Sequence, residues 1–393
     1  MNRKRDLLIG AGLVVAFGAL WLGQAAVGAS AEDTVGFVEA PMFEVDPLWP
    51  QPLPNHWTLG SAVGVGVDSR DHVFIVHRGN LVQRTEDGSS SDPPTSECCS
   101  PAPPVLEYDP QGNLVNAWGG PSDEYDWPTS NHGITIDHMD NIWIGGNGQD
   151  SHILKFTRDG EFIAQYGEVG AEMPNSNTTA HFNRVAKISF DAEANEGYVA
   201  DGYGGRRVAV IDASTGEFKR FWGAYGNTPD DTRTPPYDPD APLIDQFRTP
   251  VHCAEPTLDG FVYVCDRPND RIQVFEKDGT YVDEVRIAPR TLGDGSTWDI
   301  AFSRDPEQKY MYVADGKNMK VYVMDRAELR ILTSFGDGGR QPGMFFAVHS
   351  IATDSQGNIF TTETYEGKRV QRFVYTGIGN VPENQGVVWP SGN

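Results

Sequence analysis

Positive charge is scarce in this sequence. Its 393 residues include 31 lysines and arginines against 55 aspartates and glutamates, so the formal net charge is −24. A chain this acidic repels the phosphates of nucleic acids and the headgroups of anionic membranes, which excludes nucleic acid as a partner. Any arginine or lysine with a binding role must therefore act locally, inside a site.

Helical periodicity is also missing after the N-terminal segment, because no stretch repeats apolar residues every three or four positions. The chain instead has 43 glycines, 27 prolines and 11% aromatic residues. This composition indicates many short strands joined by tight turns. We therefore expect an all-β protein.

Cysteines are few: Cys98, Cys99, Cys253 and Cys265. Their even number is compatible with disulfides in an oxidising compartment, although connectivity cannot be read from spacing. Cys253 and Cys265 flank one predicted hairpin and could pair. The adjacent pair is expected to bond elsewhere, or to each other under strain, rather than to bind a metal.

The only long apolar run lies at the N-terminus. Residues 3–5 are basic, 7–23 are apolar and 25–31 are mostly small. This is the pattern of a cleaved export signal over residues 1–31; the alternative is an uncleaved membrane anchor over residues 7–29. Either way the folded part is predicted to be periplasmic or secreted. Removing residues 1–31, with three basic and one acidic side chain, brings the net charge to −26.

Residues 61–380 repeat one unit six times. Each unit has an apolar strand ending near Asp, a turn with Gly or Asn, a Val-x-Val-x-Asp strand and two further strands. Such repeats predict a six-bladed β-propeller of four-stranded antiparallel blades, whereas a β-sandwich would not repeat one motif six times. The ring is expected to close through a strand at residues 43–46.

The other parts of the chain have no core of their own. Residues 32–60 hold the closing strand and a proline-rich lead-in, and residues 381–393 form a C-terminal tail. Two insertions, 84–104 and 224–246, are rich in proline with serine or aspartate. We expect both to be surface loops near the mouth of the central channel.

Alignment of the six units places one set of residues in equivalent positions: Val63, His132, Ala186, His252, Trp298 and His349. Histidine falls on the second, fourth and sixth units only. In a closed ring these side chains converge with threefold spacing, which suits a metal on three imidazoles with one open position, and Zn²⁺ is the predicted ion. A lone channel histidine would more often bind water; the alternation favours the metal. The remaining histidines, among them His72 and His77, are predicted to be structural or exposed.

The loops after the second strands carry Arg78, Tyr203, Arg267, Lys317 and Tyr365. These loops open on the same face as the histidines, and arginine suits two-point binding of a carboxylate. Arg78 and Arg267 are therefore predicted to bind an anionic ligand. The alternative for Arg267 is a local ion pair with a neighbouring aspartate. Lys317 and Tyr365 are predicted to have no role in binding.

Several motifs, taken in order, resemble one family. They are His77-Arg78-Gly79, Asn131-His132-Gly133, Asp201-Gly202-Tyr203, the run from Asp266 to Phe275, and Val348-His349. On these motifs the chain is similar, from about residue 63 to residue 373, to the peptidyl-α-hydroxyglycine α-amidating lyases.

That resemblance implies a zinc ion on His132, His252 and His349, with Tyr203 as catalytic base and Arg78 and Arg267 beside it. The family also binds a structural Ca²⁺ through an Asp directly after the third histidine. This chain departs from that pattern, because Ser350 stands there.

The implied reaction cleaves the C–N bond of an α-hydroxyglycine-type carbinolamide, giving an amide and glyoxylate. Zinc would make the substrate hydroxyl more acidic, and Tyr203 would need nearby positive charge to act as a phenolate base. The expected partner is a small molecule or peptide with a carboxylate. Two alternatives stay open: a metal-dependent hydrolase such as a lactonase, and a non-catalytic NHL-repeat binding module.

Overall fold

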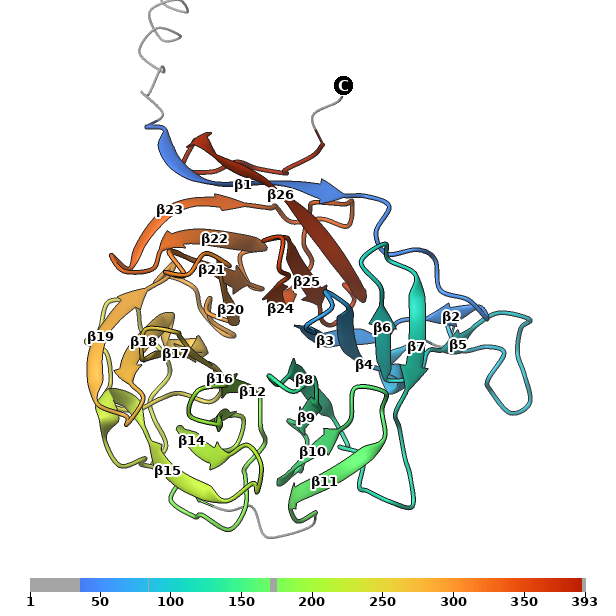
Figure 1. Ribbon diagram of the computed structural model, residues 1–393, viewed down its shortest axis with the longest axis horizontal. Coiled ribbons are helices and arrows are strands. Elements are labelled where there is room, and N and C mark those ends of the chain that lie inside the picture. The colour runs from blue at the N-terminus through green and yellow to red at the C-terminus, as the bar shows by residue number, and fades with distance from the viewer. Residues whose placement is uncertain (1–35, 84, 170–174, 391–393) are drawn as a thin grey trace, which may run out of the picture.

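Six four-stranded antiparallel sheets surround one central axis in the computed structural model, which describes residues 36–83, 85–169 and 175–390 (Figure 1). The predicted six-bladed propeller is confirmed. The predicted export signal or anchor lies outside the described residues. Among the residues described, no helix has the length and apolar character needed to cross a membrane.

Blades 1 to 3 follow each other along the chain, and the first strand of each is the innermost (Figure 1). Their strands are β3 (Ser61–Val67), β4 (Val73–Arg78), β6 (Val105–Tyr108) and β7 (Leu114–Trp118); β8 (Asn131–Ile136), β9 (Ile142–Gly146), β10 (His152–Phe156) and β11 (Phe162–Gly167); β12 (Lys187–Asp191), β13 (Glu196–Asp201), β14 (Arg207–Asp212) and β15 (Phe218–Trp222).

Blades 4 to 6 continue the same order. Their strands are β16 (Val251–Pro256), β17 (Phe261–Asp266), β18 (Arg271–Glu276) and β19 (Tyr281–Arg286); β20 (Asp299–Phe302), β21 (Tyr310–Asp315), β22 (Lys320–Asp325) and β23 (Arg330–Phe335); β24 (Val348–Thr353), β25 (Ile359–Glu363), β26 (Arg369–Val381) and β1 (Val38–Asp46). The described residues also form three short 3₁₀ turns, η1 (Gly79–Leu81), η2 (Ala224–Gly226) and η3 (Arg267–Asn269).

The ring closes through its N-terminal strand. β1 pairs antiparallel with β26 along its whole length, from Val38 opposite Val381 to Asp46 opposite Arg372. The N-terminal strand thereby becomes the outer strand of blade 6, as the sequence predicts. Because the first and last parts of the chain share one sheet, neither end of the ring can open without breaking this ladder.

The core is divided into six apolar clusters, one at each contact between neighbouring blades. Each sheet therefore buries both faces. The second strand of blade 1 illustrates this, since residues 73–76 are all fully buried. Burial on both faces explains why such strands are continuously apolar instead of alternating with polar residues.

Bulges in the innermost strands shape the axis. The pairing register shifts at the start of the first strand in blades 1, 2, 4 and 6, between Ala62 and Gly64, His132 and Ile134, Val251 and Cys253, and Val348 and Ser350. A bulge turns a side chain away from the regular alternation. The three blades with an axial histidine all have one.

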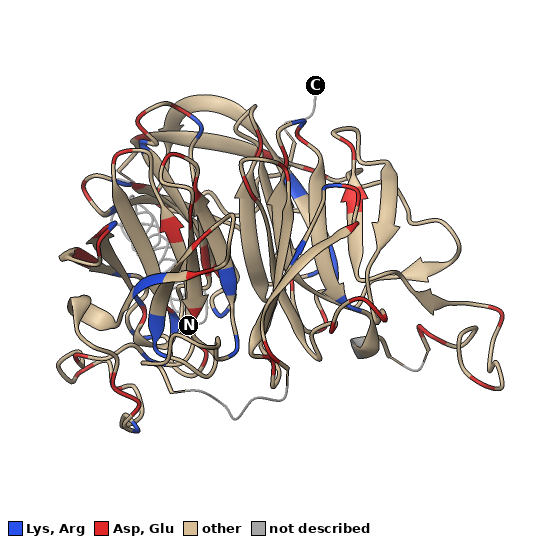
Figure 2. Ribbon diagram, turned by 60° about the horizontal axis from the view of Figure 1, so that its bottom comes forward, with Lys and Arg blue, Asp and Glu red and all other residues tan. Residues whose placement is uncertain are grey.

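The first insertion carries one of the two disulfides, and blade 4 carries the other. In the first insertion, β5 (Ser100–Pro101) pairs in parallel with β2 (Trp57–Thr58), and Cys98 is bonded to Cys99. The predicted Cys253–Cys265 disulfide is confirmed and joins β16 to β17. Acidic side chains are spread over the loops around the molecule (Figure 2). This distribution agrees with the large negative net charge.

The ring closure generates a test of stability. Phe43 on β1 is buried and its ring lies 5.5 Å from those of Tyr312 and Phe335 in blade 5. We expect Phe43→Ala to lower the free energy of unfolding by about 3–5 kcal/mol, because it removes a buried aromatic ring and leaves a cavity. Urea unfolding followed by tryptophan fluorescence measures this. The control is Phe37→Ala, whose side chain is 67% exposed just before the same strand; equal midpoints for the two variants would contradict the proposed closure.

Candidate metal centre

Three histidines converge on the axis. His132 on β8, His252 on β16 and His349 on β24 are buried, and their ring centroids lie 4.7–5.1 Å from one another. The Nε2 atoms of His132 and His349 are 3.1 Å apart. One ligand atom from each ring falls within 4.8 Å of the others. The structure thus brings together the three residues that alternate in the sequence.

The intervening blades orient two of these rings. His132 Nδ1 bonds the carbonyl of Ala186 in blade 3 at 2.7 Å, and His252 Nδ1 bonds the carbonyl of Trp298 in blade 5. Because a carbonyl only accepts, each Nδ1 carries the proton and each Nε2 presents a lone pair to the axis. This is how metal-binding histidines are usually held.

The third ring is held more loosely. His349 Nδ1 is buried without a hydrogen bond of good geometry. Burial lowers the pKa of His349, and the backbone of Val63 in blade 1 offsets a small part of that effect. The three odd-numbered blades therefore face the three histidines with backbone from the residues that align with them in sequence, Val63, Ala186 and Trp298.

All three imidazoles are neutral. Burial lowers the pKa of His132, His252 and His349 well below the usual histidine value. Positive charge adds to this effect, since Arg78 further lowers the pKa of His132 and Arg267 that of His252. Neutral imidazole is the form that binds a metal.

Tyr203 caps the histidines from the loop after β13. Its hydroxyl lies 3.1 Å from His132 Nε2 and 3.0 Å from His252 Nε2. One hydroxyl proton cannot serve two acceptor nitrogens, so the described side chains leave at least one Nε2 lone pair unsatisfied. A cation bound at this point would accept the Nε2 lone pairs of the histidines. The donor set and its tautomers therefore fit a metal ion, and three histidines suit Zn²⁺.

Two glycines allow the approach of the backbones around the centre. A Cβ on Gly202, next to Tyr203, would lie 2.0 Å from the carbonyl oxygen of Val251, which precedes His252. Gly133 has a φ of +68°, and a Cβ there would lie 2.4 Å from the carbonyl oxygen of Ala186. Larger residues at either place would push blades apart at the histidines.

The two predicted arginines lie beside the centre without acidic partners. Arg267 is buried, donates to the Tyr203 hydroxyl at 3.3 Å and stacks 4.5 Å over Trp298, while its Nε has no partner. No carboxylate among the described residues lies within ion-pair distance of it. The alternative of an ion pair with a neighbouring aspartate therefore does not hold for Arg267. It is Arg271 that forms such a pair, with Asp266 at 2.7 Å.

Arg78 is held by neutral groups only. Its Nε donates to the Asn131 carbonyl at 3.0 Å and an NH₂ group donates to Asn147 Oδ1 at 2.8 Å. Burial lowers the pKa of this guanidinium, and Tyr203, Tyr365 and the Asp150 carboxylate partly offset that effect. Two arginines that form no ion pair with a described carboxylate make the mouth of the centre a place for an anion.

Sequence inspection missed several supporting residues. Trp298 supplies both the carbonyl on His252 and the ring under Arg267, and Asn147 holds Arg78. The sequence did offer a signal for Trp298, because this residue occupies one of the six aligned axial positions. No pattern in the sequence marks Asn147. Lys317 only approaches Asp294 at 3.9 Å on the surface. Tyr365 is half exposed, with its ring 6.4 Å from that of Trp298.

The calcium site implied by the resemblance does not fit this chain. Ser350 Oγ donates to Asp299 at 2.7 Å, and the other Asp299 oxygen binds the Lys187 ammonium at 2.8 Å. The Lys187 ammonium therefore already neutralises Asp299, and the calcium of the family would need a free carboxylate at this place.

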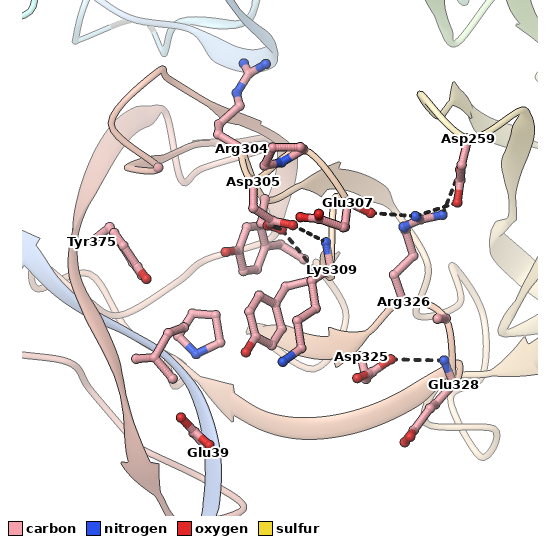
Figure 3. A pocket seen from close by; sticks show the side chains of 18 of the residues that line it. Glu39, Asp259, Arg304, Asp305, Glu307, Lys309, Asp325, Arg326, Glu328 and Tyr375 are labelled. Atoms are coloured by element: carbon pink, nitrogen blue, oxygen red, sulfur yellow. Dashed lines mark hydrogen bonds and ion pairs between the residues drawn. The ribbon is translucent and has the colours of Figure 1, made fainter.

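Two other features resemble sites but do not extend the centre. Asp68, His72 and Glu107 are close enough to share a metal, yet Arg158 already binds Asp68 at 2.7 Å and also Glu107. A cavity of about 1170 Å³ near blade 5 (Figure 3) shares no lining residue with the histidines. Its Arg326 and Asp259 pair with each other (Figure 3).

Comparison with known proteins supports the fold and a distant relationship. No protein-family model matches the chain. NHL repeat-containing protein 3 of Mus musculus is 24% identical over 304 residues, which is 75% of this chain and 71% of that protein. Peptidyl-alpha-hydroxyglycine alpha-amidating lyase 1 of Drosophila melanogaster is 22% identical over 357 residues, 84% of this chain and 59% of its own length.

The fold is also similar to that of a solved structure. A structural genomics protein of unknown function from Bacteroides thetaiotaomicron has a TM-score of 0.50 at 12% identity, covering 86% of this chain and 76% of that chain. The chain is thus similar to NHL-repeat proteins and, distantly, to amidating lyases.

His77, directly before Arg78, generates a pH prediction. Gly60 N donates to His77 Nδ1 at 3.1 Å and His77 Nε2 bonds the Pro103 carbonyl at 2.9 Å, while burial lowers its pKa to about 4. Between pH 6.5 and 4 the unfolded chain binds a proton at His77 that the folded chain does not. Stability should therefore fall with falling pH, by about 2 kcal/mol between pH 6.5 and pH 5 from this group alone.

Urea unfolding at pH 7 and pH 5 measures this contribution. In His77→Gln the loss between the two pH values should be smaller than in wild type by about 2 kcal/mol. The exposed His138 serves as control through His138→Gln. An unchanged pH dependence in His77→Gln would refute the assignment.

Proposed function

We propose that this protein is a zinc-dependent lyase that cleaves the C–N bond of an α-hydroxyglycine-type carbinolamide to an amide and glyoxylate. The observation that carries the proposal is the juxtaposition of three neutral, buried imidazoles with an arginine whose Nε is buried and unpartnered. The imidazoles suit a metal and the arginine suits a carboxylate. A substrate with a hydroxyl and a carboxylate on one carbon answers both requirements.

The chain's own residues have distinct roles in this proposal. His132, His252 and His349 would hold the ion, which when bound supplies positive charge that makes a nearby hydroxyl more acidic. Arg267 would bind the substrate carboxylate through the N–H groups that no protein carboxylate uses, with Arg78 contributing further positive charge. Holding the carboxylate in place fixes the hydroxyl close to Tyr203.

Tyr203 would move the proton. Its hydroxyl contacts the Nε2 atoms of His132 and His252 and the guanidinium of Arg267. The charge of Arg267, together with that of an ion held by the histidines, would stabilise negative charge on the Tyr203 oxygen. The phenolate takes the proton of the substrate hydroxyl, the oxygen's electron pair forms the aldehyde of glyoxylate, and the C–N bond breaks. The departing amide nitrogen takes the proton that Tyr203 received, so atoms and charge balance and the phenolate is restored.

The sequence similarity to an amidating lyase over 84% of this chain supports the lyase over a hydrolase. We also propose that the protein acts outside the cytoplasm, which its two disulfides support. The similarity to NHL repeat-containing protein 3 favours one alternative, a binding module without catalysis. A binding module would need no metal, so metal content separates the two.

Metal content gives the first test. Purified wild type should carry about one equivalent of zinc by elemental analysis, and His252→Ala should carry little, because two imidazoles hold zinc weakly. His138→Ala, which alters an exposed histidine, should keep the metal. A wild type that is metal-free after purification and does not take up added zinc would favour the binding module.

Activity gives the second test. Wild type incubated with N-benzoyl-α-hydroxyglycine should release benzamide and glyoxylate in equal amounts. Tyr203→Phe should keep its zinc but lose about 10²–10⁴-fold in kcat, because it removes the acid–base group while leaving the ring. Glyoxylate is measured by a coupled dehydrogenase assay. A zinc-loaded wild type without glyoxylate release, or a fully active Tyr203→Phe, would overturn the assignment.

A further inference from the structure

A second layer of side chains lies next to the three histidines along the central axis. Ala186, Trp298 and His349 belong to the histidine layer, and the residue that follows each of them points into the next layer: Lys187, Asp299 and Ser350. A cavity of only about 10 Å³, lined by residues of both layers, separates them. The two layers are therefore nearly in contact.

A single ammonium group holds this second layer together. Lys187 Nζ lies 2.8 Å from Glu255 Oε1 on β16 and 2.8 Å from Asp299 Oδ1 on β20. All three side chains are largely buried, at 10%, 15% and 2% exposure. The contacts link blades 3, 4 and 5 across the centre of the ring.

Hydroxyl and amide groups complete the shell around the carboxylates. Ser350 Oγ and Ile351 N, both on β24, donate to Asp299 Oδ2 at 2.7 and 3.1 Å. Ser189 Oγ donates to Glu255 Oε1 at 2.7 Å. Blade 6 is thus joined to the same network, which spans blades 3, 4, 5 and 6.

The geometry around the ammonium is that of a cation site made of oxygens. Two carboxylates converge on one positive centre at 2.8 Å, slightly longer than the roughly 2.3–2.6 Å of Ca²⁺–oxygen contacts. Two buried carboxylates without a cation would repel each other and lose hydration, which makes the cation essential. Lys187 and Glu255 also line a cavity of about 190 Å³ among the first strands of the blades.

We propose that Lys187 is an internal replacement for a divalent cation: its ammonium neutralises Glu255 and Asp299 and crosslinks blades 3 to 6, so that the propeller needs no calcium. Ser350 belongs to the same substitution, because a hydroxyl that donates to Asp299 replaces a third negative ligand. The inference is independent of the proposed lyase activity, since it concerns what holds the ring beneath the histidines.

The test compares calcium dependence in three forms of the full-length protein. Wild type should melt at the same temperature, within about 1 °C, in about 5 mM CaCl₂ and in about 5 mM EGTA. Lys187→Ala removes the ammonium and leaves room among the carboxylates. It should melt lower than wild type in EGTA and gain about 3–4 °C or more in CaCl₂, with about one calcium bound by equilibrium dialysis.

Lys187→Met is the matched control. Its side chain has nearly the length of lysine but no charge, so it should lose stability and gain nothing from calcium because the space is filled. Magnesium should help Lys187→Ala less than calcium, because Mg²⁺ demands shorter, octahedral contacts.

A second variant covers the case in which Lys187→Ala does not fold. Lys187→Ala with Ser350→Asp adds a third carboxylate and, expressed and purified in the same concentration of CaCl₂, should fold and bind calcium. The proposal is overturned if wild type loses stability in EGTA, if Lys187→Ala melts like wild type or binds no calcium, or if neither alanine variant folds in calcium. Loss of glyoxylate release alone does not bear on it, so the two proposals fail separately.

Discussion

Closure of the ring is the constraint on which the site depends. Six first strands must meet around one axis, so side chains from every second blade come within contact distance there. Two of the intervening blades contribute backbone carbonyls to the same space, from Ala186 and Trp298. One packing requirement thereby supplies both the ligand atoms of a metal centre and the groups that fix the tautomers of two of its histidines.

Charge is distributed around this axis in a consistent way. Buried carboxylates are neutralised by the chain's own cations: Asp201 by Arg207, Asp266 by Arg271, and Glu255 and Asp299 by Lys187. Arg267 and Arg78 differ, because neither forms an ion pair with a carboxylate among the described residues. In a protein of net charge −24, two such arginines mark the one face of the histidine layer where an anion would be stabilised.

Much of the architecture was open to prediction because a propeller repeats. The six units, the closing strand and the Cys253–Cys265 pairing follow from periodicity and from residues flanking one hairpin. The alternation of His132, His252 and His349 also appears by simple alignment. Asn147 and Lys187 could not be found this way, because their roles come from contacts between blades and not from any repeated position.

The sequence by itself therefore determined the number of blades, the way the ring closes and which residue types stand at the axis, since these depend on local strand patterns repeated along the chain. Only the tertiary structure decided which charges are neutralised, which nitrogens face the axis and what lies beneath them. The physical reason is that burial, hydrogen-bond direction and ion pairing depend on distances between residues such as Lys187 and Asp299, 112 positions apart in the chain, which the closed ring brings into contact.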